Sequence, residues 1–185
     1  MKIIGLGHYS RVGKDTTADA LVSALCNRWI PSKKRSFATS LKDVAHQLYG
    51  HLGLQRGWFY DQEHNAHLRD VKLPKVQKTP VQIWVELGMA GRNIYGNTWI
   101  DLTLRDDCEV LVIPDVRFQN EVDAIKALGG KVVKVVRPGI TPRDTVADKA
   151  LADFVDWDDT VGESGEILEL LTWAEREAAL IQKLL

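Results

Sequence analysis

The chain has 185 residues, 45% of them hydrophobic and 26% charged, a composition typical of one compact domain with a core large enough to fold alone. The formal net charge of −1 excludes a global basic field of the kind that drives non-specific binding to nucleic acid. The two cysteines, Cys26 and Cys108, lack any disulfide or zinc-type spacing, and no apolar run approaches the ~20 residues that span a bilayer, so we expect a cytoplasmic protein without a membrane segment.

The first third of the chain predicts two strand–helix units. The apolar run Lys2 to Leu6 leads into a glycine-containing loop, and apolar residues at helical spacing follow from Ala18 to Leu25. A second strand is predicted at Lys34 to Phe37. Ser40 is the predicted N-cap of the next helix, which carries apolar residues at helical spacing to Leu48.

The middle of the chain is polar and aromatic. Pro74 and Pro80 act there as predicted breakers, and we expect helices and loops inserted over the sheet around residues 50–98. The clearest strand follows at Val110 to Ile113, a continuous apolar run of the kind that is buried on both faces of a parallel sheet. Asp115 stands at its C-terminal end.

The last third predicts two more strands and two helices. A helix with Val122, Ile125 and Leu128 on one face ends at Gly129-Gly130, and strands are predicted at Lys131 to Val136 and at Asp159 to Val161. The C-terminal helix is predicted to turn one set of residues inward: Ile167, Leu171, Ala174, Ala178 and Ile181. This order predicts an α/β fold with a doubly wound, mainly parallel five-stranded sheet and helices on both faces.

The segment Gly7-His8-Tyr9-Ser10-Arg11-Val12-Gly13-Lys14-Asp15-Thr16-Thr17 joins the first strand to the first helix, where a phosphate-binding loop belongs. Backbone N–H groups at a helix N-terminus, with Lys14 as a point charge, suit the β- and γ-phosphates of a nucleotide. The match to G-x-x-x-x-G-K-[ST] departs at two positions. His8 replaces the first glycine, and Asp15 replaces the hydroxyl that normally binds magnesium, which leaves Thr16 as the nearest substitute. A strand-to-helix turn with an incidental glycine and lysine is the alternative.

Two segments resemble phage-type deoxynucleoside monophosphate kinases. Gly13-Lys14-Asp15-Thr16-Thr17-Ala18-Asp19 is similar to their phosphate loop, in which Gly-Lys-Asp-Thr replaces Gly-Lys-Ser/Thr. Ile113-Pro114-Asp115-Val116-Arg117-Phe118-Gln119-Asn120-Glu121, with Val135-Val136-Arg137-Pro138-Gly139 after it, is similar to their strand–helix–strand segment. The family often carries a His-x-Ser-Glu-like signature after this strand, where the chain has Thr145, Ala147 and Asp148. The resemblance implies a P-loop kinase fold and a deoxynucleotide acceptor.

Phosphoryl transfer needs groups that position two substrates and neutralise charge, and the chain offers candidates for both sides. Lys14, Asp15 and Arg117 are the catalytic candidates, and Asp15 or Thr16 the candidate ligands of Mg²⁺. The ATP site is predicted to comprise Ser10, Arg11, Val12, Gly13, Lys14, Asp15, Thr16, Thr17 and Arg137. The acceptor site is predicted to comprise Lys42, Arg92, Asp115, Arg117 and Glu121.

Structural roles compete with several of these assignments. Asp115 can cap the helix that follows it, and Arg117 with Glu121 matches an ordinary i,i+4 pair. Arg137 and Arg143 flank a Pro-Gly loop, around residues 137–150, which is either a lid or an exposed charged loop. His64 and His67 lack a third ligand for a metal, and Trp99 is expected in the core.

The chain is therefore expected to be one kinase domain, residues 1–185, that transfers phosphate from ATP to a deoxynucleoside monophosphate with Mg²⁺. A kinase for another small acceptor and a nucleotide-dependent ATPase or switch are the alternatives. No nucleic-acid or membrane partner is expected, and the sequence leaves a monomer and a homodimer open.

Overall fold

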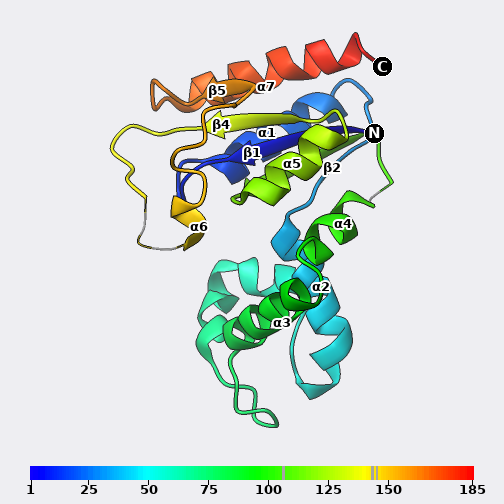
Figure 1. The fold of residues 1–185 in the computed structure, drawn as a ribbon, viewed down its shortest axis with the longest axis vertical. Coiled ribbons are helices and arrows are strands. Elements are labelled where there is room, and N and C mark those ends of the chain that lie inside the picture. The colour runs from blue at the N-terminus through cyan, green and yellow to red at the C-terminus, as the bar shows by residue number, and fades with distance from the viewer. Residues whose placement is uncertain (106, 143, 145) are drawn as a thin grey trace. The chain divides into compact units, whose positions relative to one another are not determined.

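The computed structural model describes residues 1–105, 107–142, 144 and 146–185. The chain divides into two compact units. The sheet unit comprises Met1–Ser36 and Asp106–Leu185, and the helical unit comprises Phe37–Arg105 (Figure 1). The helical unit thus begins before, and ends after, the insertion expected around residues 50–98.

The sheet unit is built on five parallel strands in the order β2-β3-β1-β4-β5, which confirms the predicted α/β fold. The strands are β1 (Lys2–Gly7), β2 (Ser32–Lys34), β3 (Val110–Val116), β4 (Lys131–Val135) and β5 (Asp159–Val161). Strand β1 lies between β3 and β4, with Ile3 opposite Leu111 and Gly5 opposite Val132. Both of its faces are covered, which is why its sequence is a continuous apolar run.

Helices cover both faces of the sheet (Figure 1). On one face α1 (Lys14–Cys26) and α7 (Ile167–Gln182) share a buried cluster with β1, β3 and β4, including Leu6, Leu21 and Trp173. On the other face α5 (Gln119–Ala127) packs Ile125 against Gly5. A Cβ at Gly5 would lie 2.7 Å from the Ile125 Cδ1 atom, so the close approach of α5 requires glycine at this position.

The buried face of α7 differs from the predicted one. Ile167 and Leu171 are 61% and 43% exposed, whereas Ala174, Ala178 and Ile181 are buried as predicted. Leu170, Trp173 and Glu177 complete the buried face. At about 100° per residue, Leu170, Trp173 and Glu177 all lie to one side of the predicted stripe, so the buried face is rotated toward Trp173 and leaves Leu171 at its edge. Trp173 also donates from its indole N–H to Asp159 Oδ2 at 2.9 Å, which ties the helix to β5.

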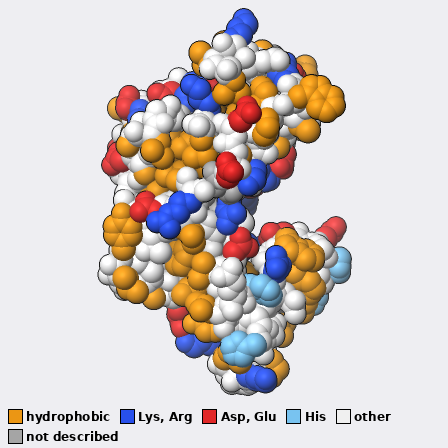
Figure 2. Space-filling model, turned by 90° about the vertical axis from the view of Figure 1, so that its right-hand side faces the viewer, with side chains coloured by type: hydrophobic (Ala, Val, Ile, Leu, Met, Phe, Trp, Pro, Cys, Tyr) orange, Lys and Arg blue, Asp and Glu red, His pale blue; other side chains and the backbone are white. Residues whose placement is uncertain are grey.

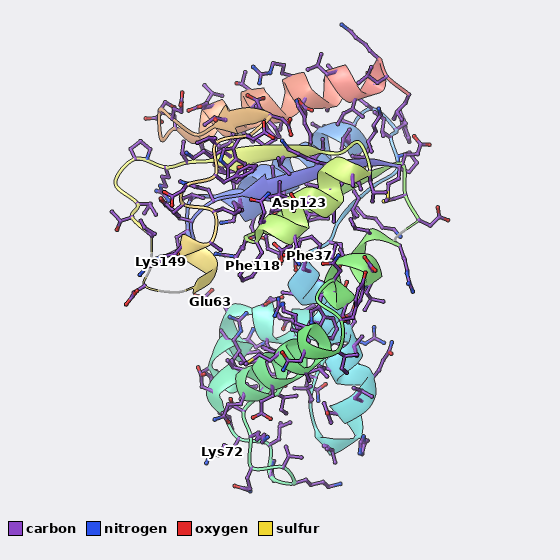
Figure 3. All side chains as sticks on the ribbon, viewed as in Figure 1. Phe37, Glu63, Lys72, Phe118, Asp123 and Lys149 are labelled. Carbon is purple, nitrogen blue, oxygen red and sulfur yellow. The ribbon has the colours of Figure 1, made fainter. Side chains whose placement is uncertain are left out.

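The second strand ends earlier than predicted. Strand β2 pairs Ser32 to Lys34 with β3, whereas Phe37 is already the first residue of α2 (Phe37–Tyr49), as Figure 3 shows. Phe37 is buried. Ser40 therefore lies inside this helix and is not its N-cap. Its buried hydroxyl lies 2.7 Å from that of Thr103. The apolar Phe37 that suggested a strand instead belongs to the helix.

The helical unit has its own core. Three 3₁₀ segments follow α2, at Gly50–Leu52, Gly57–Asp61 and Glu63–Asp70, and then come α3 (Pro80–Ile94) and α4 (Thr98–Leu104). Their buried side chains form one cluster of Ala45, Leu54, Tyr60, Ile83 and Trp84. Pro80, predicted to break a helix, instead begins α3, and Thr79 caps the helix by accepting from the Gln82 N–H at 3.1 Å. Trp99 is buried, as expected, and donates to the Gly88 carbonyl at 3.0 Å.

The surface mixes side-chain types. Figure 2 shows exposed hydrophobic groups interspersed with charges of both signs on the face it presents, in keeping with the near-zero net charge. Within the described residues, no helix has both the length and the apolar character needed to cross a bilayer.

Candidate phosphate-binding site

The loop between β1 and α1, predicted to bind phosphate, has a strained backbone. His8 has φ 101°, Arg11 has φ 66° and Gly13 has φ 101°, all in the region that L-residues rarely adopt. His8 tolerates the position that the motif reserves for glycine, and its ring stacks on Tyr9 at 3.7 Å between centroids. A second aromatic ring, Trp157, meets His8 edge-on at 6.5 Å. Burial, followed by the charge of Lys134, lowers the pKa of His8 to about 4, so the ring is neutral at physiological pH.

Lys14 is folded into this loop. Its side chain is only 5% exposed, and Nζ donates to the His8 carbonyl at 3.1 Å and to the Tyr9 carbonyl. Burial, together with the nearby positive charge of Arg117, lowers its pKa to about 8, although Asp148 opposes the shift. The loop therefore holds a buried cation that donates to two of the loop's own carbonyl groups.

The three residues after Lys14 point in different directions. Thr17 is fully buried and its hydroxyl donates to the Gly13 carbonyl at 3.0 Å, so it fastens the first turn of α1. Asp15 is exposed, with its carboxylate 3.5 Å from Lys34 Nζ. Thr16 lines a cavity beside the loop. Lys34 also pairs with Asp19 at 2.7 Å, which occupies part of the basic cluster Lys33-Lys34-Arg35.

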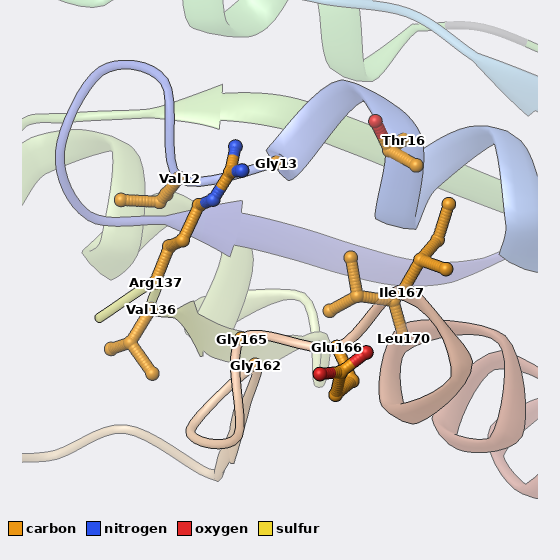
Figure 4. Close-up of a pocket in the computed structure, with 10 residues that line it drawn as sticks. All are labelled: Val12, Gly13, Thr16, Val136, Arg137, Gly162, Gly165, Glu166, Ile167 and Leu170. Atoms are coloured by element: carbon orange, nitrogen blue, oxygen red, sulfur yellow. The ribbon is translucent and has the colours of Figure 1, made fainter. Parts of the chain in front are cut away.

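The cavity beside the loop has a volume of about 160 Å³. Figure 4 shows the Arg137 side chain extending from the end of β4 toward the start of α1. The lining combines loop, strand-end and α7 residues: Val12, Gly13, Thr16, Val136, Arg137, Gly162, Gly165, Glu166, Ile167 and Leu170. Of the predicted ATP-site residues, Val12, Gly13, Thr16 and Arg137 thus meet at one cavity.

A buried carboxylate that sequence analysis did not select lies against the loop. The Asp148 side chain, in α6 (Val146–Lys149), is 1% exposed and accepts from the Ser10 backbone N–H at 3.2 Å and the Ser10 hydroxyl at 2.7 Å. Arg117 Nη1 donates to Asp148 Oδ1 at 2.5 Å and to Ser10 Oγ at 3.2 Å. The only sequence signal for Asp148 is its place in the segment that departs from the family's His-x-Ser-Glu-like signature.

The end of β3 supplies Arg117 and its support. Glu121 is 5% exposed, and its Oε2 accepts from the backbone N–H groups of Arg117 at 2.7 Å and Phe118 at 3.1 Å. It therefore anchors the backbone of Arg117 at the start of α5, while the guanidinium pairs with Asp148. Asp115 lies within β3 and Phe118 is the N-cap of α5, so Asp115 does not cap that helix. The negative charge of Asp115 opposes the lowering of the Lys14 pKa, more weakly than that of Asp148 does.

The other predicted acceptor cations belong to the helical unit. Lys42 lies with its Nζ atom 3.7 Å from Asp61 Oδ1 and 5.0 Å from the centre of the Trp84 ring. Arg69 donates to the same Asp61 oxygen at 2.7 Å. Arg92 is in the last turn of α3.

Two further expectations concern the lid and metals. Arg143, one candidate lid cation, lies outside the described residues, as does Thr145 of the departing signature. His64 and His67 both fall in the 3₁₀ segment Glu63–Asp70. Among the residues that the structure describes, no three His, Cys, Asp or Glu side chains gather into a potential metal site.

Comparison with known proteins gives partial matches to kinases. No protein-family model matches the chain. A putative deoxynucleotide monophosphate kinase of Acanthamoeba polyphaga mimivirus is 53% identical over 45 residues, 24% of this chain and 23% of that protein. The deoxynucleotide monophosphate kinase of Enterobacteria phage T4 is 36% identical over 61 residues, 33% of this chain and 25% of that protein.

The matched part of the chain thus spans about a quarter of the length of each of these curated relatives. The matches agree with the kinase resemblance read from the sequence. Over the matched segments, the chain is similar to deoxynucleotide monophosphate kinases, including one from a phage.

Proposed function

We propose that the chain transfers the γ-phosphoryl group of ATP to a deoxynucleoside monophosphate. The observation that carries this proposal is that two cations contact the loop after β1: Lys14 donates to the His8 and Tyr9 carbonyls, and Arg117, just after the neighbouring strand β3, donates to Ser10. In open parallel sheets, ligands bind outside the carboxyl ends of the strands. The partial matches to curated kinases support the same acceptor class.

The residues of the sheet unit have separate proposed roles. The N–H groups of the loop and the Lys14 ammonium bind the β- and γ-phosphates, and the cavity lined by Thr16 and Arg137 takes another part of ATP. Arg117 binds the acceptor phosphate, since a guanidinium offers five donors and the Glu121 carboxylate anchors its backbone. An oxygen of the acceptor phosphate attacks the γ-phosphorus, the bond to the β–γ bridging oxygen breaks, and ADP leaves without a covalent enzyme intermediate.

Mg²⁺ fits the donors at the start of α1. It prefers oxygen ligands and is commonly held by one or two protein groups together with substrate phosphates. Asp15 or Thr16 would supply one such oxygen, a carboxylate facing Lys34 or a hydroxyl facing the cavity, since the two side chains point in different directions. When bound, the ion neutralises negative charge on the transferring phosphate.

We propose that Lys42 and Arg92 of the helical unit bind the acceptor nucleotide. Residues 137–150 are proposed to form a lid over the phosphate loop. The bonds of Asp148 to Ser10 support the lid assignment, because they attach the end of this segment to the phosphate loop. The deoxy preference rests on the resemblance to the curated kinases. We propose a cytoplasmic location on the cysteine usage noted above.

The test is to incubate the protein with ATP, Mg²⁺ and each of the four deoxynucleoside monophosphates, and to follow ADP and free phosphate. We expect ADP release that depends on at least one acceptor, with no free phosphate. Lys14→Ala is the matched inactive control, with an expected loss of at least ~10³-fold in turnover because it removes a cation that stabilises the transferring phosphate. Phosphate release without an acceptor would instead identify an ATPase.

A further inference from the structure

Asp148 is the most deeply buried carboxylate of the proposed site. Its side chain is 1% exposed, so the carboxylate has lost nearly all contact with solvent. An ionised carboxylate tolerates such burial only when it is paired and hydrogen-bonded. The structure provides both, through the guanidinium of Arg117 and through the N–H and hydroxyl of Ser10.

The partners of Asp148 are themselves functional candidates. Ser10 belongs to the phosphate loop, and Arg117 is the proposed ligand of the acceptor phosphate. A single guanidinium nitrogen, Nη1, contacts both Asp148 Oδ1 and Ser10 Oγ. Asp148 therefore holds the Nη1 atom of the guanidinium against the loop.

The backbone of Arg117 is held by a second carboxylate. Glu121 accepts from the Arg117 N–H at 2.7 Å, so the residue is restrained at both ends of its side chain. Among the described residues, the hydrogen bonds of the guanidinium all use Nη1, which leaves its Nη2 and Nε donors for a ligand. A long side chain restrained in this way loses less conformational freedom when it binds a phosphate.

We propose that Asp148 is a positioning residue for acceptor binding, which orients Arg117 on the phosphate loop so that its remaining donors meet the acceptor phosphate. The inference rests on the proposed function and adds to it a residue from the segment between β4 and β5. Asp148 does not touch either substrate in this role. It acts through the direction and restraint that it gives to Arg117.

A purely structural role makes a different prediction. If Asp148 served only to neutralise the cations Lys14 and Arg117 within the fold, its loss would lower stability and leave the use of the two substrates equally affected. A positioning role instead predicts a loss that falls on the acceptor alone. Removal of a negative charge beside the phosphate loop lowers the electrostatic repulsion of ATP, so the KM for ATP should stay constant or fall in assays at a pH where Lys14 is protonated.

The first experiment compares Asp148→Asn and Asp148→Ala with Asp153→Ala. Asp148→Asn keeps the shape and one acceptor oxygen but loses the charge, and Asp153 is an exposed carboxylate five residues further along the chain. Both Asp148 variants should lower kcat/KM for the acceptor, by about 10- to 100-fold for Asp148→Ala, since small misplacements of a binding group have costs of this order. Asp153→Ala should match the wild type. Equal losses for ATP and acceptor, or no loss, would overturn the inference.

The second experiment is a double-mutant cycle with Arg117→Ala. If Asp148 acts through Arg117, the Arg117→Ala/Asp148→Ala protein should use the acceptor as well as Arg117→Ala alone, within ~2-fold. Multiplied losses would show that Asp148 acts by another route. Calorimetric binding of the acceptor without ATP gives the same comparison without turnover, and thermal unfolding shows whether each variant is folded. If Asp148→Ala does not fold, Asp148→Asn replaces it in the double-mutant cycle.

The outcomes separate the two proposals. A wild-type protein without acceptor-dependent ADP release contradicts the proposed function itself. An active wild type whose Asp148 and Arg117 effects multiply contradicts only the positioning role.

Discussion

At the scale of single residues, the loop stabilises the Lys14 ammonium through its own carbonyl groups when no ligand is bound. Its Nζ atom bonds to the carbonyls of His8 and Tyr9, which belong to the same loop. Since phosphate is a stronger partner for an ammonium than a carbonyl is, the ligand would replace these bonds. The buried lysine then regains in the complex the electrostatic stabilisation that it lacks alone.

This exchange predicts a pH dependence of ATP binding. The Lys14 pKa is lowered to about 8 in the protein without ligand, first by burial and then by Arg117, and bound phosphate favours the protonated form. Below about pH 8 the lysine is charged and the affinity should be constant. Above it, a proton must be taken up on binding, so the Kd should rise toward tenfold per pH unit. Titrations from about pH 6.5 to 9.5 test this, and Lys14→Ala should lack the inflection. A flat wild-type profile would contradict the assignment.

The pair Asp15 and Thr16 divides two roles at the start of α1. Consecutive helical residues point about 100° apart, and the structure places the Asp15 carboxylate near Lys34 while Thr16 lines the cavity. We therefore predict that Thr16 contacts phosphate, whereas Asp15 acts on the acceptor side or binds Mg²⁺ through water. A carboxylate aimed straight at the phosphates would repel them.

The test compares Thr16→Ala with Asp15→Asn. Without Mg²⁺, ATP affinity should fall for Thr16→Ala and hold or rise for Asp15→Asn, because only the first variant loses a phosphate donor. With Mg²⁺, turnover of Asp15→Asn should drop. Full turnover of Asp15→Asn would mean that Asp15 is only a favourable charge at a helix N-terminus, worth about 0.3–1 kcal/mol of stability.

At the scale of elements, the end of β1 depends on a contact with the segment after α6. A Cβ at Gly7 would lie 2.5 Å from Trp157 Cη2 and 3.2 Å from the Val116 carbonyl oxygen. The Trp157 ring thus fills the space directly over the strand, just before the loop begins, and it lies nearly perpendicular to the His8 ring, 6.5 Å away between centroids. Glycine is required here for packing, whereas at Gly13 it serves a backbone with φ 101°.

Gly7→Ala is therefore expected to destabilise the protein by about 1–3 kcal/mol, the usual cost of overpacking a filled site. Urea unfolding measures the change. Gly96→Ala is the matched control, because a Cβ there meets nothing within 4 Å, and it should leave the stability unchanged or slightly higher. Trp157→Leu should recover part of the loss in the Gly7→Ala background. Equal stability of Gly7→Ala and Gly96→Ala would refute the packing role.

At the scale of the whole molecule, the sheet unit and the helical unit each contain a hydrophobic core. One contains residues of α1, α7 and the sheet, and the other contains Ala45, Leu54, Tyr60, Ile83 and Trp84 of the helical unit. The proposed phosphate loop lies in the sheet unit, and Lys42 lies in the helical unit. A substitution that destabilises one core should therefore lower the local stability of its own unit first.

Trp84→Ala tests this division. Trp84 is 8% exposed and meets the Tyr60 ring at 5.3 Å, so its removal should cost about 3–5 kcal/mol within the helical unit. Hydrogen exchange should accelerate over residues 37–105 while ATP still binds. Trp58→Ala, at a 61% exposed tryptophan of the same unit, should change neither property. Loss of ATP binding together with the exchange protection would show that the two cores are one cooperative unit.

How far the sequence predicts the molecule depends on the range of each interaction. The order of strands and helices, the five parallel strands and the loop before α1 follow from patterns within about 20 residues, because burial imposes a period on neighbouring side chains. Of the two three-residue strands at the edges of the sheet, β5 has the predicted bounds and β2 does not. Strand β2 is three residues long and exposed, so little burial marks its end.

The sequence by itself determined the α/β fold, the loop with Lys14 and the resemblance to deoxynucleoside monophosphate kinases. Only the tertiary structure revealed that Asp148 pairs with Ser10 and Arg117, that Glu121 holds the Arg117 backbone, and that Trp157 covers Gly7. Ser10 and Asp148 are 138 residues apart. No local pattern encodes such a contact, because it arises only when the crossovers of the sheet bring distant loops to the same edge.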